Sequence, residues 1–75
     1  MVKLPRVTAA HVLRALARDG WYESRQSGSH KILRHATKPG IVVVAYHVGD
    51  ILRPKTLQSI IEDAGLTVEQ FGRLL

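Results

Sequence analysis

Residues 21–47 read WYESRQSGSHKILRHATKPGIVVVAYH and contain three strand-like runs with two turn signals between them. The runs predict strands over residues 21–26, 29–35 and 41–47, and the last of these is rich in β-branched side chains. Ser27-Gly28 marks the first break, and Lys38-Pro39-Gly40 marks the second. The spacing therefore predicts three consecutive antiparallel strands.

The second turn also predicts which residues pair across the last two strands. If the chain folds back about the middle of residues 37–40, Leu33 lies opposite Val44 and His30 lies opposite His47. A slip of one residue would move every side chain to the other face of the sheet.

Helical patterns lie on both sides of the strands. A first helix is expected from Thr8, whose hydroxyl can cap it, to about Arg18. A second runs from about Pro54 to Ala64, and a short third begins at Thr67. The order α-β-β-β-α with a short C-terminal helix predicts a two-layer α+β fold, with a three-stranded antiparallel sheet, helices on one face and the other face open.

Length and composition narrow the class of protein. A chain of 75 residues predicts one domain, residues 1–75, with a thin core and no deep cofactor pocket. The absence of cysteine excludes disulfides and cysteine-based zinc sites. The start lacks a signal-peptide pattern, and the longest apolar stretch, residues 41–46, is too short to cross a bilayer. We therefore expect a cytoplasmic protein that does not interact with membranes.

Charge is distributed unevenly along the chain. The 11 Lys and Arg and 6 Asp and Glu residues give a net charge of +5. Residues 1–55 carry a net +7, and residues 56–75 carry a net −2. A basic surface on a small domain favours a polyanionic partner such as nucleic acid, although solubility alone is an alternative explanation.

Histidine is the side chain that suits RNA cleavage, because its ordinary pKa of ~6.5 lets it accept and donate a proton near neutral pH. His30 is the strongest of the four histidines as a candidate, since it follows Gly28-Ser29 at the predicted entry to a strand. The cations Arg25, Lys31 and Arg34 lie near it in sequence and could hold a phosphate. If His47 faced His30, the two imidazoles could share the acid and base roles.

The remaining polar positions give weaker signals. His11 is interpreted as structural or exposed, and His35, near the turn, as exposed. Arg53 and Lys55 surround the start of the second helix, where free N–H groups favour phosphate, although a solvated lysine explains Lys55 equally well. Zinc at a His30–His47 pair would lack further ligands, so we expect neither a metal nor another cofactor.

Several motifs, in this order and spacing, resemble the HicA (YcfA-like) toxins of type II HicAB toxin–antitoxin systems. The motifs are Lys3-Leu4-Pro5, Gly20-Trp21, Arg25-Gln26-Ser27-Gly28-Ser29-His30, Val42-Val43-Val44-Ala45-Tyr46-His47, Leu52-Arg53-Pro54-Lys55-Thr56-Leu57-Gln58-Ser59-Ile60, Ala64-Gly65-Leu66 and Phe71. The resemblance covers nearly the whole chain, from Lys3 to Leu75.

The resemblance implies a fold like that of double-stranded-RNA-binding domains and activity as a ribosome-independent mRNA interferase. It implies that the histidine of the Gly-Ser-His motif, His30, is the active-site residue, and that a HicB-type antitoxin masks the site. Two positions differ from the family pattern. Lys55 stands where the family usually has glycine, and Ala45-Tyr46 stands where Pro-x is common.

The prediction is thus an endoribonuclease toxin with His30 as catalyst and His47 as a possible assistant. The residues predicted to bind RNA are Arg25, Gly28, Ser29, Lys31, Arg34, Arg53 and Lys55. One alternative is a module that binds double-stranded RNA without cutting it, since shape and phosphate contacts suffice for such binding. Another is a protein-interaction domain with an acidic partner.

Overall fold

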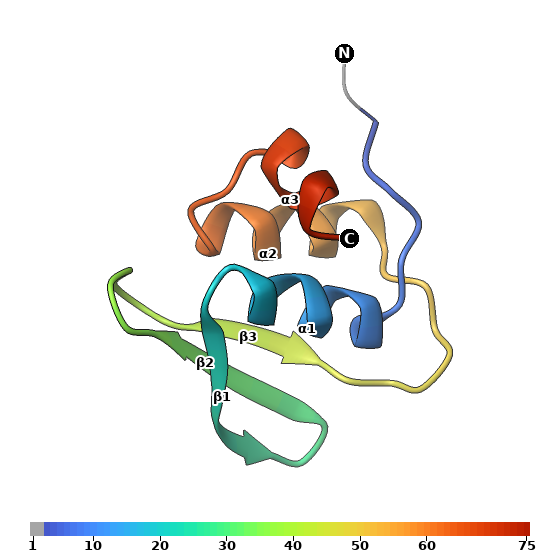
Figure 1. Ribbon diagram of the computed structural model, residues 1–75. Coiled ribbons are helices and arrows are strands. Elements are labelled where there is room, and N and C mark those ends of the chain that lie inside the picture. The colour runs from blue at the N-terminus through green and yellow to red at the C-terminus, as the bar shows by residue number, and fades with distance from the viewer. Residues whose placement is uncertain (1–2) are drawn as a thin grey trace.

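The computed structural model describes residues 3–75, which form three helices and one sheet (Figure 1). The elements, in chain order, are α1 (Ala9–Arg18), β1 (Trp21–Ser27), β2 (His30–His35), β3 (Val42–Ala45), α2 (Pro54–Asp63) and α3 (Val68–Leu74). Every helix and strand predicted from the sequence is present. The third strand is shorter than predicted at both ends.

The sheet is antiparallel with the order β1-β2-β3, so β2 is its central strand. Figure 1 shows the three helices on one side of the sheet and nothing on the other. The helix α1 contacts β1 and β3, α2 contacts β3, and α3 packs against the other two helices. The predicted two-layer α+β fold with one open sheet face is confirmed. None of the helices within residues 3–75 has the length and apolarity needed to cross a membrane.

The helices begin where the polar side chains predict. The Thr8 hydroxyl accepts a hydrogen bond from the backbone N–H of His11, and the His11 ring accepts one from the backbone N–H of Thr8. Thr67 and Gln70 form the same reciprocal capping arrangement at the start of α3. Each arrangement satisfies backbone donors that the first turn of a helix leaves free. His11 is thus a capping residue that remains exposed.

The core lies between the sheet and the helices. Trp21, Leu33, Val42 and Val44 are buried on the sheet side of it. The helices and the segment before α1 supply the other buried apolar side chains, which are Val7, Ala9, Val12, Ala15, Leu16, Leu57, Ile60, Ile61, Ala64 and Phe71. This burial fixes which face of each strand points away from the helices.

The predicted register between β2 and β3 is wrong by two residues. Leu33 pairs with Val42 rather than with Val44, and His30 pairs with Ala45 rather than with His47. A shift of two residues preserves the face on which each side chain lies, because side chains alternate with a period of two. The partners of His30 and Leu33 were therefore predicted wrongly, but the shift does not change which side chains share a face.

The conformation of the loop between β2 and β3 explains this shift. Contacts of the His35 ring hold the loop in place. His35 was expected to be exposed, but it is half-buried. The Nδ1 atom of His35 accepts hydrogen bonds from the backbone N–H groups of Thr37 and Lys38, at 3.1 Å and 3.2 Å. Its Nε2 atom lies 2.6 Å from the carbonyl oxygen of Asp19. The ring also packs edge-on against Trp21, with 5.2 Å between the ring centroids.

Lys38 fixes the same loop to the helices. Its ammonium donates to the Asp19 carboxylate at 2.6 Å and to the Ala64 carbonyl, at the end of α2, at 3.0 Å. A cation is favourable at the C-terminal end of a helix, where carbonyl groups are free. These contacts hold a loop longer than the tight turn that the Lys38-Pro39-Gly40 sequence suggested.

We predict that His35→Ala destabilises the protein by about 1–3 kcal/mol, because two backbone N–H groups and the Asp19 carbonyl lose their partner. For a domain of this size, each kcal/mol corresponds to about 4–8 °C in Tm. His47→Ala is the matched control, since His47 is exposed. Thermal unfolding followed by circular dichroism checks the difference, and equal Tm values for the two variants would contradict this role of His35.

Candidate functional site

A tight hairpin turn places His30 at the start of the central strand. Gly28 and Ser29 form the turn, and Ser27 pairs with His30 across it. Gly28 has a φ of +59°, a conformation that suits glycine at the first central position of a two-residue hairpin. The His30 side chain is exposed, and within residues 3–75 its ring forms no hydrogen bond. Both ring nitrogens are therefore available to a ligand.

The alternation of side chains along β2 assigns His30 to the open face of the sheet. Leu33 is buried under the helices, so Lys31 and His35 share its face and His30 shares the opposite one. Cross-strand partners lie on the same face as each other. The residues assigned in this way to the open face are Tyr22, Arg25, Ser27, His30, Ile32, Arg34, Val43 and Ala45.

A β-bulge in β1 decides where Arg25 lies. The register between β1 and β2 shifts between Glu23, which pairs with Leu33, and Arg25, which pairs with Ile32. The residue between them, Ser24, is the extra one. Without it, strict alternation would assign Arg25 to the helix-covered face with Glu23. The bulge therefore assigns Arg25 to the same face as His30.

Two arginines accompany His30 on this face at different distances. Arg25 is the diagonal cross-strand neighbour of His30, a position with about 7–8 Å between Cα atoms, which a long side chain can span. Arg34 lies four residues along β2 from His30, about 13 Å at the usual rise of a strand. Both arginines are exposed. The hairpin thus combines an accessible imidazole with one nearby and one more distant guanidinium.

Lys31, which was also predicted to bind RNA, lies on the opposite face from His30. Its ammonium is 3.3 Å from the Glu23 carboxylate and 5.3 Å from the centre of the Tyr46 ring. The side chain is half-buried and its charge is partly neutralised. Proximity in sequence to His30 therefore does not place this cation at the same site.

The remaining predicted residues lie outside the hairpin. His47 is exposed in the loop after β3, two residues beyond Ala45, the β3 partner of His30. Arg53 and Lys55 are exposed at the start of α2, where Arg53 is the N-cap residue but forms no side-chain capping bond. The loop that leads to them is held against the segment before α1 by a hydrogen bond from the Leu52 N–H to the Val7 carbonyl. Arg53 and Lys55 lie at the start of α2, and α2 is part of the helical layer rather than of the sheet (Figure 1).

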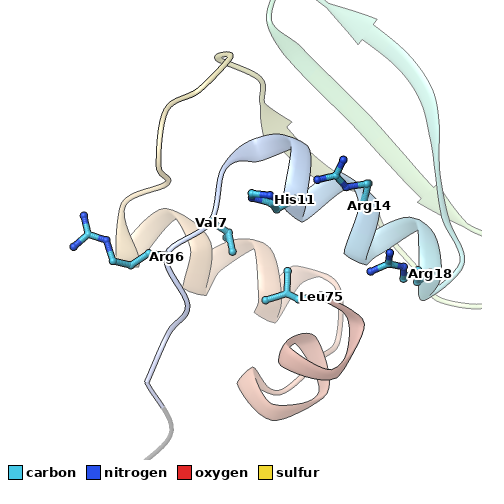
Figure 2. A pocket seen from close by; sticks show the side chains of 6 residues that line it. All are labelled: Arg6, Val7, His11, Arg14, Arg18 and Leu75. Atoms are coloured by element: carbon cyan, nitrogen blue, oxygen red, sulfur yellow. The ribbon is translucent and has the colours of Figure 1, made fainter.

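The structure also reveals a basic surface that the sequence reasoning missed. Arg6, His11, Arg14 and Arg18 line a hollow of about 540 Å³ together with Val7 and Leu75 (Figure 2). His11, Arg14 and Arg18 follow one another at intervals of three and four residues, the spacing of one face of a helix. That spacing was a usable signal in the sequence. The position of Arg6 and Leu75 beside this row depends on the fold.

Potential metal ligands do not gather at either surface. Within residues 3–75 there is no group of three His, Asp or Glu side chains that could hold a metal ion. The His30–His47 pair considered for zinc is not a cross-strand pair.

One comparison with known proteins identifies the family. The family described as HicA toxin of bacterial toxin-antitoxin matches residues 9–66. The matched region begins with α1 and ends at Leu66, three residues beyond the end of α2. This chain belongs to the HicA toxin family. The matched region includes the three strands of the sheet, the hairpin that carries His30, and the helices α1 and α2. None of the curated proteins compared with the chain matches it.

Proposed function

We propose that this HicA toxin is an endoribonuclease that cuts mRNA without the ribosome, with His30 transferring a proton during cleavage. The observation that supports the proposal is the position of His30. Its imidazole is exposed at the start of β2, on the uncovered face of the sheet, and Arg25 is its diagonal neighbour. Because the chain belongs to a toxin family, an activity that harms the cell is expected of this site.

The chemistry proposed for this site is an internal transfer at one phosphate. A base removes the proton of a ribose 2′-hydroxyl, and the oxygen forms a bond to the adjacent phosphorus. The bond from phosphorus to the 5′-oxygen of the next nucleotide breaks, and an acid gives that oxygen a proton. The products are a 2′,3′-cyclic phosphate and a 5′-hydroxyl. An imidazole can perform either proton transfer, and such help typically gives about 10²–10⁴-fold in rate.

The neighbouring residues would hold the RNA around that imidazole. Arg25 would bind the phosphate being cut, because a guanidinium can donate two parallel hydrogen bonds to one phosphate. Arg34 would contact a phosphate further along the strand. Gly28 and Ser29 are small, so the backbone of the RNA can approach the turn closely.

The other predicted RNA contacts take lesser roles in this proposal. Arg53 and Lys55 would bind RNA that extends from the sheet toward the start of α2. Lys31 would contribute least, since its ammonium already contacts Glu23. His47 lies two residues beyond Ala45, the partner of His30, and would assist only if a bound substrate spans the distance between the two imidazoles.

The antitoxin partner expected for a toxin of this kind would cover the same face. Tyr22, which pairs with Arg34, and Val43, which pairs with Ile32, are 54% and 42% exposed there. Exposed apolar side chains rimmed by charge are typical of a surface that another protein covers. We propose that a HicB-type antitoxin binds the open face and thereby blocks access to His30.

We predict that His30→Ala abolishes cleavage of a labelled mRNA by the purified protein, while His47→Ala retains most of the activity. Loss of the proton transfer by His30 should lower the rate by about 10²–10⁴-fold. Circular dichroism of both variants should match the wild type, because both side chains are exposed. Analysis of the cut ends should find 2′,3′-cyclic phosphates.

Two results would contradict the assignment. Full activity of His30→Ala would exclude His30 as the catalyst, and 3′-hydroxyl ends would show that water rather than the 2′-hydroxyl attacks. Intact RNA in the wild-type reaction, with binding retained, would instead favour the module that binds RNA without cutting it.

We further predict that Arg25→Ala weakens binding of an uncleavable 2′-O-methyl RNA more than Lys31→Ala does. Each phosphate contact releases counterions, so its loss lowers the slope of log affinity against log salt by about one. Lys31→Ala removes the same charge from the opposite face and should leave the slope nearly unchanged. Titrations at several salt concentrations check this, and equal slopes for the two variants would contradict the assignment of the open face.

A further inference from the structure

The hollow beside α1 has the features of a second binding site, on the helical side of the molecule. Arg6 and Val7 come from the segment before α1, His11, Arg14 and Arg18 come from α1, and Leu75 follows α3 (Figure 2). The volume of about 540 Å³ falls in the range of pockets that hold small ligands or one or two side chains. Val7 is buried, and Leu75 is 45% exposed.

The basic groups of the hollow form no ion pair within the described residues. The ion pairs within residues 3–75 join Lys31 to Glu23 and Lys38 to Asp19, and none involves Arg6, Arg14 or Arg18. No Asp or Glu lines the hollow. The side chains of Arg14 and Arg18 lie one helical turn apart on α1, whereas the Arg6 guanidinium points away from them (Figure 2). The charges of Arg14 and Arg18 repel one another, and an anion bound between them would relieve that repulsion.

Two of the groups are already held in position. The guanidinium of Arg18 donates to the Leu74 carbonyl at 2.6 Å and has further N–H groups to donate. The Nδ1 atom of His11 accepts from the Thr8 backbone N–H, so in the neutral ring the proton is on Nε2, which can donate. Groups that are fixed before binding lose less entropy when a ligand arrives.

The character of the hollow favours a protein segment over nucleic acid. Single-stranded RNA is usually held by aromatic rings on which the bases stack, and no aromatic ring other than the His11 imidazole lines this surface. Its accessible apolar part is the aliphatic Leu75, which is 45% exposed, beside the buried Val7. An aliphatic patch bordered by arginines matches a peptide in which carboxylates flank an aliphatic side chain.

We propose that this hollow is a docking site for an acidic segment of a protein partner, with an aliphatic side chain of the segment on Leu75 and its carboxylates on Arg14 and Arg18. The site lies in the helical layer, apart from the open sheet face that carries His30. A partner could therefore bind here while the hairpin remains accessible. The docking site is independent of whether His30 cleaves RNA.

The test uses the full chain and a fluorescent, end-blocked peptide of alternating Glu and Leu residues, with a peptide of alternating Gln and Leu as the uncharged control. Fluorescence anisotropy should show binding of the Glu peptide and not of the Gln peptide. Arg14→Glu should weaken binding about tenfold, and R14E/R18E should weaken it further by a similar factor, the size of one charge-assisted hydrogen bond each. R25E/R34E, with the same charge change on the open face, should keep most of the affinity.

Other outcomes overturn the proposal. No binding of the Glu peptide to the wild type, or equal losses in R14E/R18E and R25E/R34E, would show that the hollow is no specific site. If a single-stranded RNA displaces the peptide and loses affinity in Arg14→Glu, the hollow is a nucleic-acid surface instead. Should R14E/R18E fail to fold because of the Arg18–Leu74 contact, Arg14→Glu alone decides, since Arg14 forms no hydrogen bond within the described chain. Unchanged mRNA cleavage by Arg14→Glu would separate this site from the one at His30.

Discussion

Burial of one face of a three-stranded sheet under the helices is the constraint on which the other features depend. Leu33, Val42 and Val44 are 3% exposed or less, so the faces of β2 and β3 are fixed by the hydrophobic effect. Because side chains alternate along a strand, a buried Leu33 requires His30 to point away from the core. The exposure of the candidate catalyst is therefore a consequence of the packing, and the site cannot move to the other face without loss of the core.

Local sequence patterns predicted most of this fold, and tertiary contacts account for what they missed. Thr8 and Thr67 cap the helices that their positions indicated, and every predicted strand is present. The prediction of the register between β2 and β3 was wrong, because His35 and Lys38 contact Asp19 and the end of α2. Both of these lie far from the loop in the sequence. The error was an even number of residues, so it did not alter which side chains share a face of the sheet.

The candidate site shows the same division between local and distant information. The Gly28-Ser29 turn and His30 could be found from sequence, since two-residue hairpins carry a recognisable glycine. The side on which each cation lies could not, because a single extra residue at Ser24 assigns Arg25 to the open face while Lys31 binds Glu23 on the other. Likewise, His11, Arg14 and Arg18 follow one another along α1, but they line a hollow only because the fold places Leu75 beside them. Arginines thus lie on two surfaces that have different shapes and, in our proposals, different ligands: Arg25 and Arg34 on the open face, and Arg6, Arg14 and Arg18 at the hollow.

The most direct test of the central claim is a map of the RNA-binding face by NMR, with amide and histidine ring signals recorded while an uncleavable 2′-O-methyl RNA is added to the wild-type protein. The account predicts that the signals that shift most belong to the open face and its hairpin, from Tyr22 and Arg25 through His30 to Val43. Shifts confined to α1, with the His30 ring unaffected at saturation, would contradict it.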